Sequence, residues 1–319
     1  MKVVSYTTSD SEAWDEFLGS CFNATFLHSR RFLSYHGSRF EDASLKILNK
    51  RGRLVGLFPA AINPSDPKEV VSHPGITYGG IVRGRELQGS DIIQCFEEIA
   101  RVYCERGFER LLYKAIPTVY QLYPAEDDLY ALFRQGAKRT RCDLSAAIDL
   151  SRRDGPPARA RRALKKASKH GVRVEASTDR YQEFWVILSE RLSSRYRTNP
   201  AHTLDEIRDL AARFPENIRL AVSLLDSELI AGLVLFETAQ AVHAQYSASN
   251  ETGACTGALE LVTESCIRDA ALQNKRYFDL GISSEQDGAV LNTGLYEFKT
   301  KFGASGIAHE FYSLKLCSR

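Results

Sequence analysis

One order of elements occurs twice along the chain, and this repetition constrains the fold more than any other sequence feature. The order is two strands joined by a polar turn, a third strand, a helix and a closing strand. In the first half these elements are expected at 44–48, 54–60, 70–72, 91–104 and 110–113. In the second half they are expected at 218–225, 229–236, 242–247, 259–272 and 277–280. A duplicated α+β fold with a mixed sheet accounts for this pattern, and for a length of 319 residues, better than two unrelated domains would.

The boundary between the two copies is marked by a change in composition. A linker-like stretch at 151–157 precedes a predicted helix that is rich in Arg and Lys and ends at Gly171. We therefore expect an N-terminal domain over residues 1–145 and a C-terminal domain over residues 146–319.

The overall charge excludes a protein whose whole surface attracts nucleic acid. Forty-two Lys and Arg residues stand against 40 Asp and Glu residues, which leaves a formal net charge of +2. An anionic partner must therefore meet a local patch, and the basic residues from Arg161 to Lys169 share one face of the predicted helix. This face is either solvated or in contact with a polyanionic substrate such as tRNA.

Cysteine usage and hydropathy indicate a cytoplasmic enzyme without a membrane span. The seven cysteines are scattered, with neither a C-x-x-C pair nor a His at metal spacing, so we expect reduced packing residues and no metal. Residues 1–6 lack the apolar core of a signal peptide, and the longest apolar run, 229–236, is too short to cross a bilayer. The oligomeric state stays open.

The last stretch of the chain carries the strongest chemical signal. A short apolar strand ends in Asp279, Gly281 and the serines Ser283 and Ser284, and Lys299 and Lys301 follow. Fixed polar donors followed by cations suit a phosphate-bearing or acyl-carrying ligand. The first copy lacks this pattern, which assigns the chemistry to the second copy.

Four segments together resemble the FemAB-like group of tandem GNAT acyltransferases, the nonribosomal peptidyltransferase superfamily. They are the helix end at 161–171, Gln245-Tyr246-Ser247, the strand end at 278–281 and the motif at 298–303. The resemblance implies a donor that is either an acyl-CoA or an aminoacyl-tRNA, and an amine acceptor. The tRNA-dependent bridge enzymes usually carry a long helical arm, for which the segment after Tyr181 is too short, and this favours acyl-CoA.

The resemblance also implies a donor site in the second copy. The strand carrying Gln245, Tyr246 and Ser247 is expected to part from its neighbour at a bulge, which frees backbone N–H groups for the acyl carbonyl. Gly253 and Gly257 are expected to cradle the CoA pyrophosphate at a helix start, with Lys301 as a further cofactor contact. The alternative is a glycine-rich turn with Thr256 as helix N-cap.

The remaining candidates concern the acceptor and the catalysis. His73 is a candidate general base, or else a structural histidine before a proline. Asp279 would accept the amine proton or hold a sugar hydroxyl, or else cap the turn at Gly281, and Lys299 would stabilise the oxyanion or else lie on the surface. The candidate acceptor contacts are Tyr78, Gly79, His202, Ser283 and Ser284.

These features predict an N-acyltransferase that moves an acyl group from a CoA thioester to a primary amine. The preferred acceptor is a nucleotide-linked amino sugar, as in the synthesis of surface polysaccharide in the cell envelope. One alternative is an aminoacyl-tRNA-dependent peptidyltransferase of peptidoglycan bridge synthesis. A second is a non-catalytic GNAT-like binding module.

Overall fold

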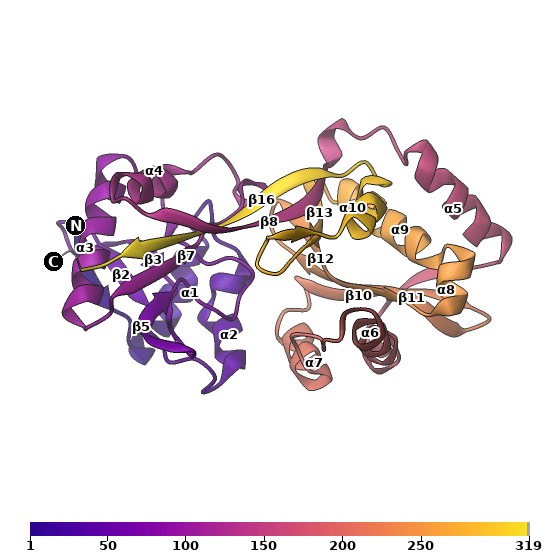
Figure 1. Ribbon diagram of the computed structural model, residues 1–319, viewed down its shortest axis with the longest axis horizontal. Coiled ribbons are helices and arrows are strands. Elements are labelled where there is room, and N and C mark those ends of the chain that lie inside the picture. Colours follow the sequence, from indigo (N-terminus) through magenta and orange to yellow (C-terminus); the bar gives the residue numbers. More distant parts are fainter. Residues whose placement is uncertain (318–319) are drawn as a thin grey trace. The chain divides into compact units, whose positions relative to one another are not determined.

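The computed structural model describes residues 1–317, apart from the side chain of Tyr196, and it divides into two compact units (Figure 1). Unit 1 comprises Met1–Asp143, Glu285–Val290 and the stretch that starts at Ala308. Unit 2 comprises Leu144–Ser284 and Leu291–Ile307. Each unit has its own hydrophobic core.

Unit 1 contains a small antiparallel sheet and a second group of strands. The sheet has the order β1 (Lys2–Ser5), β2 (Leu45–Leu48), β3 (Leu54–Phe58), β6 (Val82–Arg83). The second group has the order β4 (Ala61–Asn63), β5 (Asp66–Val71), β7 (Arg110–Lys114), β16 (Ser305–Lys315). The helices are α1 (Ser11–Leu18), α2 (Arg30–Leu33), α3 (Ser90–Glu105) and α4 (Asp127–Arg134).

The core of unit 1 forms because α3 has one apolar face. Ile92, Phe96, Ile99 and Tyr103 recur at helical spacing, are fully buried and join the apolar side chains of the strands in one cluster. The predicted helix at 91–104 and the strand at 110–113 are thereby confirmed.

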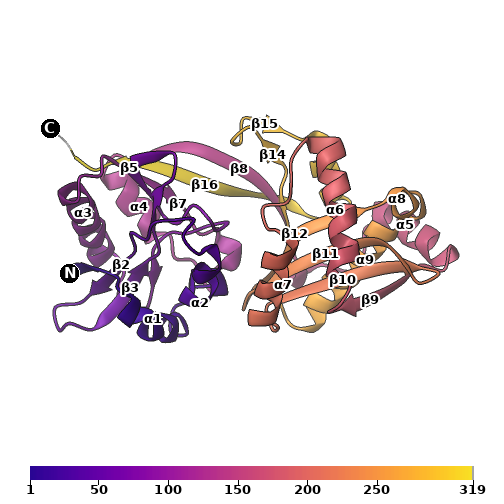
Figure 2. The same cartoon turned by 90° about the horizontal axis from the view of Figure 1, so that it is seen from below.

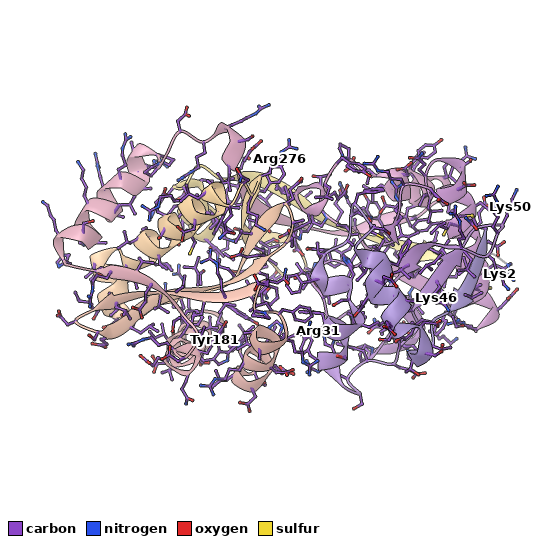
Figure 3. The ribbon with its side chains drawn as sticks, turned by 180° about the vertical axis from the view of Figure 1, so that it is seen from behind. Lys2, Arg31, Lys46, Lys50, Tyr181 and Arg276 are labelled. Carbon is purple, nitrogen blue, oxygen red and sulfur yellow. A yellow bond between two sulfur atoms is a disulfide. The ribbon has the colours of Figure 1, made fainter. Side chains whose placement is uncertain are left out.

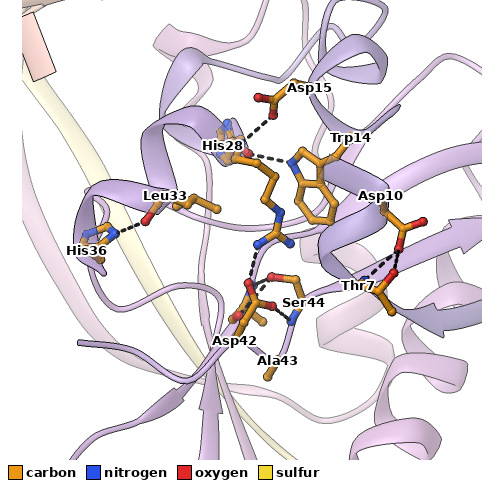
Figure 4. A network of polar contacts seen from close by, with 12 residues as sticks. Thr7, Asp10, Trp14, Asp15, His28, Leu33, His36, Asp42, Ala43 and Ser44 are labelled. Atoms are coloured by element: carbon orange, nitrogen blue, oxygen red, sulfur yellow. Dashed lines mark hydrogen bonds and ion pairs between the residues drawn. The ribbon is translucent and has the colours of Figure 1, made fainter. Parts of the chain in front are cut away.

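A buried arginine anchors the N-terminal helices of unit 1 (Figure 4). The guanidinium of Arg30 lies 3.4 Å from the centroid of the Tyr6 ring and 3.9 Å from that of Trp14, and it forms an ion pair with Asp42. Trp14 in turn donates from Nε1 to the carbonyl of His28 at 2.9 Å. Stacking and pairing together compensate for burying this charge.

Unit 2 is a sheet with helices on both faces (Figures 1 and 2). Its strand order is β8 (Lys138–Asp149, of which the residues from Leu144 belong to this unit), β13 (Tyr277–Ile282), β12 (Ala241–Ser249), β11 (Glu228–Glu237), β10 (Ile218–Leu225), β9 (Arg173–Ser177). One face is covered by α6 (Tyr181–Tyr196) and α7 (Leu204–Arg213). On the other face lie α5 (Ala158–Lys169), α8 (Glu251–Thr256), α9 (Ala258–Leu272) and α10 (Thr293–Thr300).

A short hairpin follows β13. β14 (Ser284–Glu285) and β15 (Val290–Leu291) form a separate two-stranded sheet between β13 and α10 in the sequence. The elements predicted for both copies are present, so the α+β class and the duplicated architecture are confirmed.

One prediction about the cysteines is wrong. Cys104 at the end of α3 and Cys317 after β16 form a disulfide, with their Cα atoms 5.7 Å apart. They are separated by 213 residues in the sequence, so no spacing motif predicts this disulfide. The other five cysteines are free thiols.

Within residues 1–317, no helix combines the length and the apolar character needed to cross a membrane.

Candidate active site

The site lies in unit 2, where β12 and β13 part. The two strands pair in parallel at three positions, Ala241 with Tyr277, Val242 with Phe278 and His243 with Asp279, and β12 then continues to Ser249. The register of β12 against β11 shifts between Ala244 and Tyr246, which leaves Gln245 as a bulged residue. This is the parting at a bulge expected from the sequence, and such an opening exposes backbone amides that can bind a carbonyl oxygen.

A buried carboxylate stands at the last paired position. Asp279 is completely buried, and it accepts hydrogen bonds from the Ser145 hydroxyl at 2.6 Å and from the Gly281 N–H at 2.9 Å. Nδ1 of His243 lies 2.9 Å from its other oxygen. The predicted cap on Gly281 is therefore present, and Asp279 also holds a histidine that the sequence reasoning did not single out.

Lys299 reaches the same strand end from α10. Its Nζ donates to the carbonyl of Gly281 at 2.8 Å and to that of Ile282 at 2.5 Å. The side chain is buried, which excludes the alternative of a surface lysine. Burial lowers the pKa of Lys299 to about 8, although the charge of Asp279 partly opposes the shift.

Two buried polar atoms beside this cluster lack a partner among the described residues. They are the Ser283 hydroxyl oxygen, in a residue 1% exposed, and Oε1 of the bulged Gln245. Buried polar groups are nearly always hydrogen-bonded, so two buried polar atoms without a hydrogen-bond partner indicate that a ligand binds at the strand opening. Ser284 differs, because its hydroxyl accepts a hydrogen bond from the Leu144 N–H at 3.2 Å.

Tyr246, another predicted contact on β12, points to the face covered by α6 and α7. The Tyr246 hydroxyl lies 2.6 Å from Nδ1 of His202 and accepts a bond from its backbone N–H at 3.1 Å. Trp185 of α6 packs edge-on against the Tyr246 ring. Burial raises the pKa of Tyr246. The structure thus joins Tyr246 and His202, whereas Ser247 is exposed on the strand.

Gly253 and Gly257 are positions of close packing. A Cβ at Gly253 would lie 2.2 Å from the carbonyl oxygen of Ile230, and one at Gly257 would lie 2.9 Å from that of Ala163. Gly253 lies inside the short helix α8, and Gly257 is the N-cap of α9 at φ 80°. The alternative that made Thr256 the N-cap of this helix is wrong, because Thr256 ends α8 and donates to the carbonyl of Thr252. The role of the two glycines in binding CoA stays a prediction.

Lys301 lies at the C-cap of α10, with Nζ 5.4 Å from the centroid of the Phe298 ring. No described contact ties it to the strand opening, and its role in cofactor binding stays a prediction.

Three predicted residues, His73, Tyr78 and Gly79, belong to the interior of unit 1. His73 has φ 60°, accepts a 3.3 Å hydrogen bond from the Gly75 N–H, and has its pKa lowered to about 2 by burial. Tyr78 donates to the Thr25 hydroxyl at 3.3 Å, and Gly79 places its carbonyl 3.1 Å from Nε2 of His28. A Cβ at Gly79 would lie 1.7 Å from the carbonyl oxygen of Ser72, so packing alone requires glycine there.

The sequence reasoning missed His243 and Ser145. His243 lies two residues before Gln245, and a polar residue between Val242 and Ala244 at a half-buried strand position was the available signal. Ser145 lies at the predicted domain boundary and is brought to Asp279 only by the pairing of β8 with β13. The described residues contain no group of three or more His, Cys, Asp or Glu side chains that could hold a metal ion.

One family model matches part of the second half of the chain. Residues 157–300 match the family model "Acetyltransferase (GNAT) domain". None of the curated proteins matches the sequence.

Solved structures resemble the whole chain at low sequence identity. FemX superposes with a TM-score of 0.70 at 11% identity, over 99% of this chain and 97% of that chain. L-PGS from Bacillus licheniformis superposes with a TM-score of 0.63 at 12% identity, over 99% of this chain and 94% of that chain. A tandem GNAT protein from the clavulanic acid biosynthesis pathway superposes with a TM-score of 0.56 at 12% identity, over 100% of this chain and 99% of that chain.

Proposed function

We propose that this chain, which is an acyltransferase with a FemAB-like tandem GNAT fold, transfers an acyl group from acyl-CoA to a primary amine. The preferred acceptor is the amino group of a nucleotide-linked amino sugar. The reaction would take place at the opening between β12 and β13 in unit 2.

The parting of β12 and β13 beside Lys299 is the observation that carries this proposal. An acyl thioester in the opening would have backbone amides of β12 beside it, and the bulge at Gln245 turns one of them out of the regular ladder. Lys299 adds a cationic group that already holds the end of β13. These are the requirements of acyl transfer: a fixed carbonyl, and positive charge where the oxyanion develops.

The chemistry needs neither a covalent enzyme intermediate nor a metal. The amine nitrogen attacks the thioester carbonyl, the C–N bond forms, and the C–S bond breaks with release of the CoA thiol. One proton leaves the amine and one is delivered to the sulfur. The enzyme must therefore accept and return a proton as well as stabilise the oxyanion.

The nucleotide-sugar acceptor rests on the resemblance, because some members of the FemAB-like group acylate amino sugars carried on nucleotides. We propose His202, Ser283 and Ser284 in unit 2 as its contacts. The roles of Tyr78 and Gly79 in acceptor binding and of His73 in catalysis stay predictions. Ser283 has the strongest support, because its buried hydroxyl has no partner among the described residues.

The second candidate is transfer from an aminoacyl-tRNA in peptidoglycan synthesis. The basic helix α5 favours it: Arg159, Arg161, Arg162, Lys165, Lys166 and Lys169 are all exposed, and within the described part of the chain none of them forms an ion pair. Figure 3 shows the side chains of this helix projecting outward. An unpaired basic face of this kind binds phosphates well.

The helical arm does not separate the two candidates. α6 and α7 are short helices of 16 and 10 residues, as the sequence indicates. The chain nevertheless covers 97% of the FemX chain, which leaves little length in FemX for an additional arm. The similarity to FemX therefore supports the tRNA-dependent alternative at least as well as the CoA-dependent one.

Ligand binding discriminates between the candidates. CoA, acetyl-CoA, UDP-N-acetylglucosamine and a dTDP-linked 4-amino sugar are each added in a thermal shift assay, since a ligand that binds the folded state raises the melting temperature. The proposal predicts a shift with acetyl-CoA and a further shift with the amino sugar. No shift with CoA at saturation, together with binding of charged tRNA that weakens steeply with salt, would establish the alternative. No shift with any probe would favour a non-catalytic module.

A further inference from the structure

We propose that His243 accepts the proton of the attacking amine and that Asp279 positions it for this task. The inference rests on the proposed acyl transfer and assigns it a general base. Neither the family match nor the sequence motifs point to this histidine.

The first argument is the geometry of the pair. His243 and Asp279 face each other at the last paired position of β12 and β13, with Nδ1 2.9 Å from the carboxylate. Because Asp279 also accepts bonds from Ser145 and Gly281, its carboxylate is held in one orientation. An ionised carboxylate can only accept hydrogen bonds, so it selects the tautomer with the proton on Nδ1 and leaves the lone pair on Nε2.

The second argument is the difference in burial between the partners. The side chain of His243 is 13% exposed, whereas that of Asp279 is 0% exposed. A base must reach its substrate, and the residue that orients it must be shielded from water to hold one tautomer. The two side chains meet these opposite requirements.

The third argument is the position of the imidazole beside the turn that Lys299 holds. A Cβ built on Gly281 would lie 3.5 Å from Cε1 of His243, so this edge of the ring faces Gly281. The carbonyl of Gly281 is the one that Lys299 binds at 2.8 Å. The proposed base and the proposed oxyanion group thus adjoin the same turn, beside the opening of the strands.

The described contacts identify charged groups near His243. Asp279 approaches it from β13, and Lys299 of α10 lies within the electrostatic reach of that carboxylate. On β11 the residue opposite His243 is Phe236, while the next residue, Glu237, forms an ion pair with Arg219. On the side of α7, His202 is bonded to Tyr246. Asp279 is therefore the carboxylate that the described contacts place on the imidazole.

The proton balance is complete without another reactant. The neutral amine attacks the thioester carbon, and the nitrogen gives one proton to Nε2 of His243 as the C–N bond forms. The C–N bond forms as the C–S bond breaks, and the imidazolium returns a proton to the departing thiolate. Asp279 stays ionised throughout and stabilises the imidazolium.

The kinetic test compares His243→Gln and Asp279→Asn with His170→Gln, which alters an exposed histidine at the end of α5. The donor is acetyl-CoA, and the acceptor is a dTDP-linked 4-amino sugar. Loss of a general base is expected to lower kcat by roughly 10²–10⁴-fold and to change the dependence of kcat on pH. Asp279→Asn should lower kcat with little change in the KM for acetyl-CoA. A His243→Gln enzyme with wild-type kcat and an unchanged pH profile would overturn the proposal.

Chemical labelling gives a readout that does not depend on turnover. Diethyl pyrocarbonate reacts with unprotonated imidazole nitrogen, and peptide mapping locates the modified histidine. We expect His243 to be labelled in the wild type, to be protected by acetyl-CoA, and to be labelled with a different pH dependence in Asp279→Asn. Absence of label at His243 would overturn the proposal. Labelling without any product from the sugar would instead contradict the proposed acceptor.

Discussion

Lys299 and Gly281 are joined by a 2.8 Å hydrogen bond from Nζ to the backbone carbonyl. The bond links α10 to the end of β13, at the point where β13 has left β12. A buried ammonium group at this place has both a structural and a catalytic use, because it satisfies carbonyls that the sheet leaves unpaired and places positive charge beside the opening. The two uses can be separated by experiment.

Substitution of Lys299 by Met should impair both catalysis and stability, whereas Lys301→Met should do neither. Loss of an oxyanion group typically lowers kcat by about 10²–10³-fold, and leaving the buried Gly281 carbonyl without this donor costs about 1–3 kcal/mol. Lys301 contacts only the Phe298 ring among the described residues, so its kcat should stay within about threefold. Steady-state kinetics and thermal unfolding of both variants measure the two effects. Equal and mild losses of kcat would contradict the oxyanion role.

The rate of transfer should fall as the pH rises above about 8. Burial lowers the pKa of Lys299 to about 8, so the side chain loses its positive charge there and not near the ordinary value of 10.5. A pH profile of kcat between 7 and 10 checks this, and Lys299→Arg, which keeps its charge, should retain activity to higher pH than the wild type. A wild-type profile that stayed flat to pH 10 would show that the charge of Lys299 is not needed.

Acid should destabilise unit 1 through its buried histidines. Burial lowers the pKa of His28 from 6.5 to about 4, although its hydrogen bonds with the backbone of Gly79 and Thr25 partly oppose the shift. Between pH 6.5 and about 4, His28 is protonated in the unfolded chain but stays neutral in the native state. The free energy of unfolding should therefore fall with decreasing pH by up to roughly 1.4 kcal/mol per pH unit.

Urea unfolding from pH 7 to pH 4.5, followed by a probe in unit 1, measures this slope. His28→Gln should reduce the slope, whereas His170→Gln, on the exposed end of α5, should leave it unchanged. An identical slope in all three proteins would contradict the assignment.

Gly253 should tolerate no side chain, whatever its role in binding. The Cβ of Gly253→Ala would lie 2.2 Å from the carbonyl oxygen of Ile230, and such overpacking typically costs about 1–3 kcal/mol. Gly294→Ala is the matched control, because the nearest atom to its Cβ would be 3.9 Å away and alanine favours the helix. The first variant should melt below the wild type and the second at or above it, as followed by circular dichroism. An unchanged melting temperature for Gly253→Ala would contradict the close packing.

The sequence predicted the elements well where hydrophobic periodicity is strong. β10 and α3 fall within one residue of the expected ranges, because their apolar residues recur at strand and helix spacing. Lys299 was predicted as a functional residue from its place in a motif, but its burial and its two carbonyl partners depend on how α10 packs on β13. No local pattern contains that information.

Contacts between distant segments explain the remaining differences. Ser145 and His243 reach Asp279 from β8 and β12 through strand pairing, and Cys104 meets Cys317 across 213 residues. Gly253 and Gly257 were expected to cradle the CoA pyrophosphate because free N–H groups at a helix start favour anions. In the structure the closely approaching groups are the backbones of Ile230 and Ala163.

The crystal structure of the protein soaked with a stable acetyl-CoA thioether analogue tests the central claim most directly. The account predicts that the pantetheine arm lies between β12 and β13, with the carbonyl-equivalent group beside the turn at Gly281 that Lys299 holds. Density for the analogue away from this opening, or no binding at saturation while an aminoacyl-tRNA binds, would contradict it.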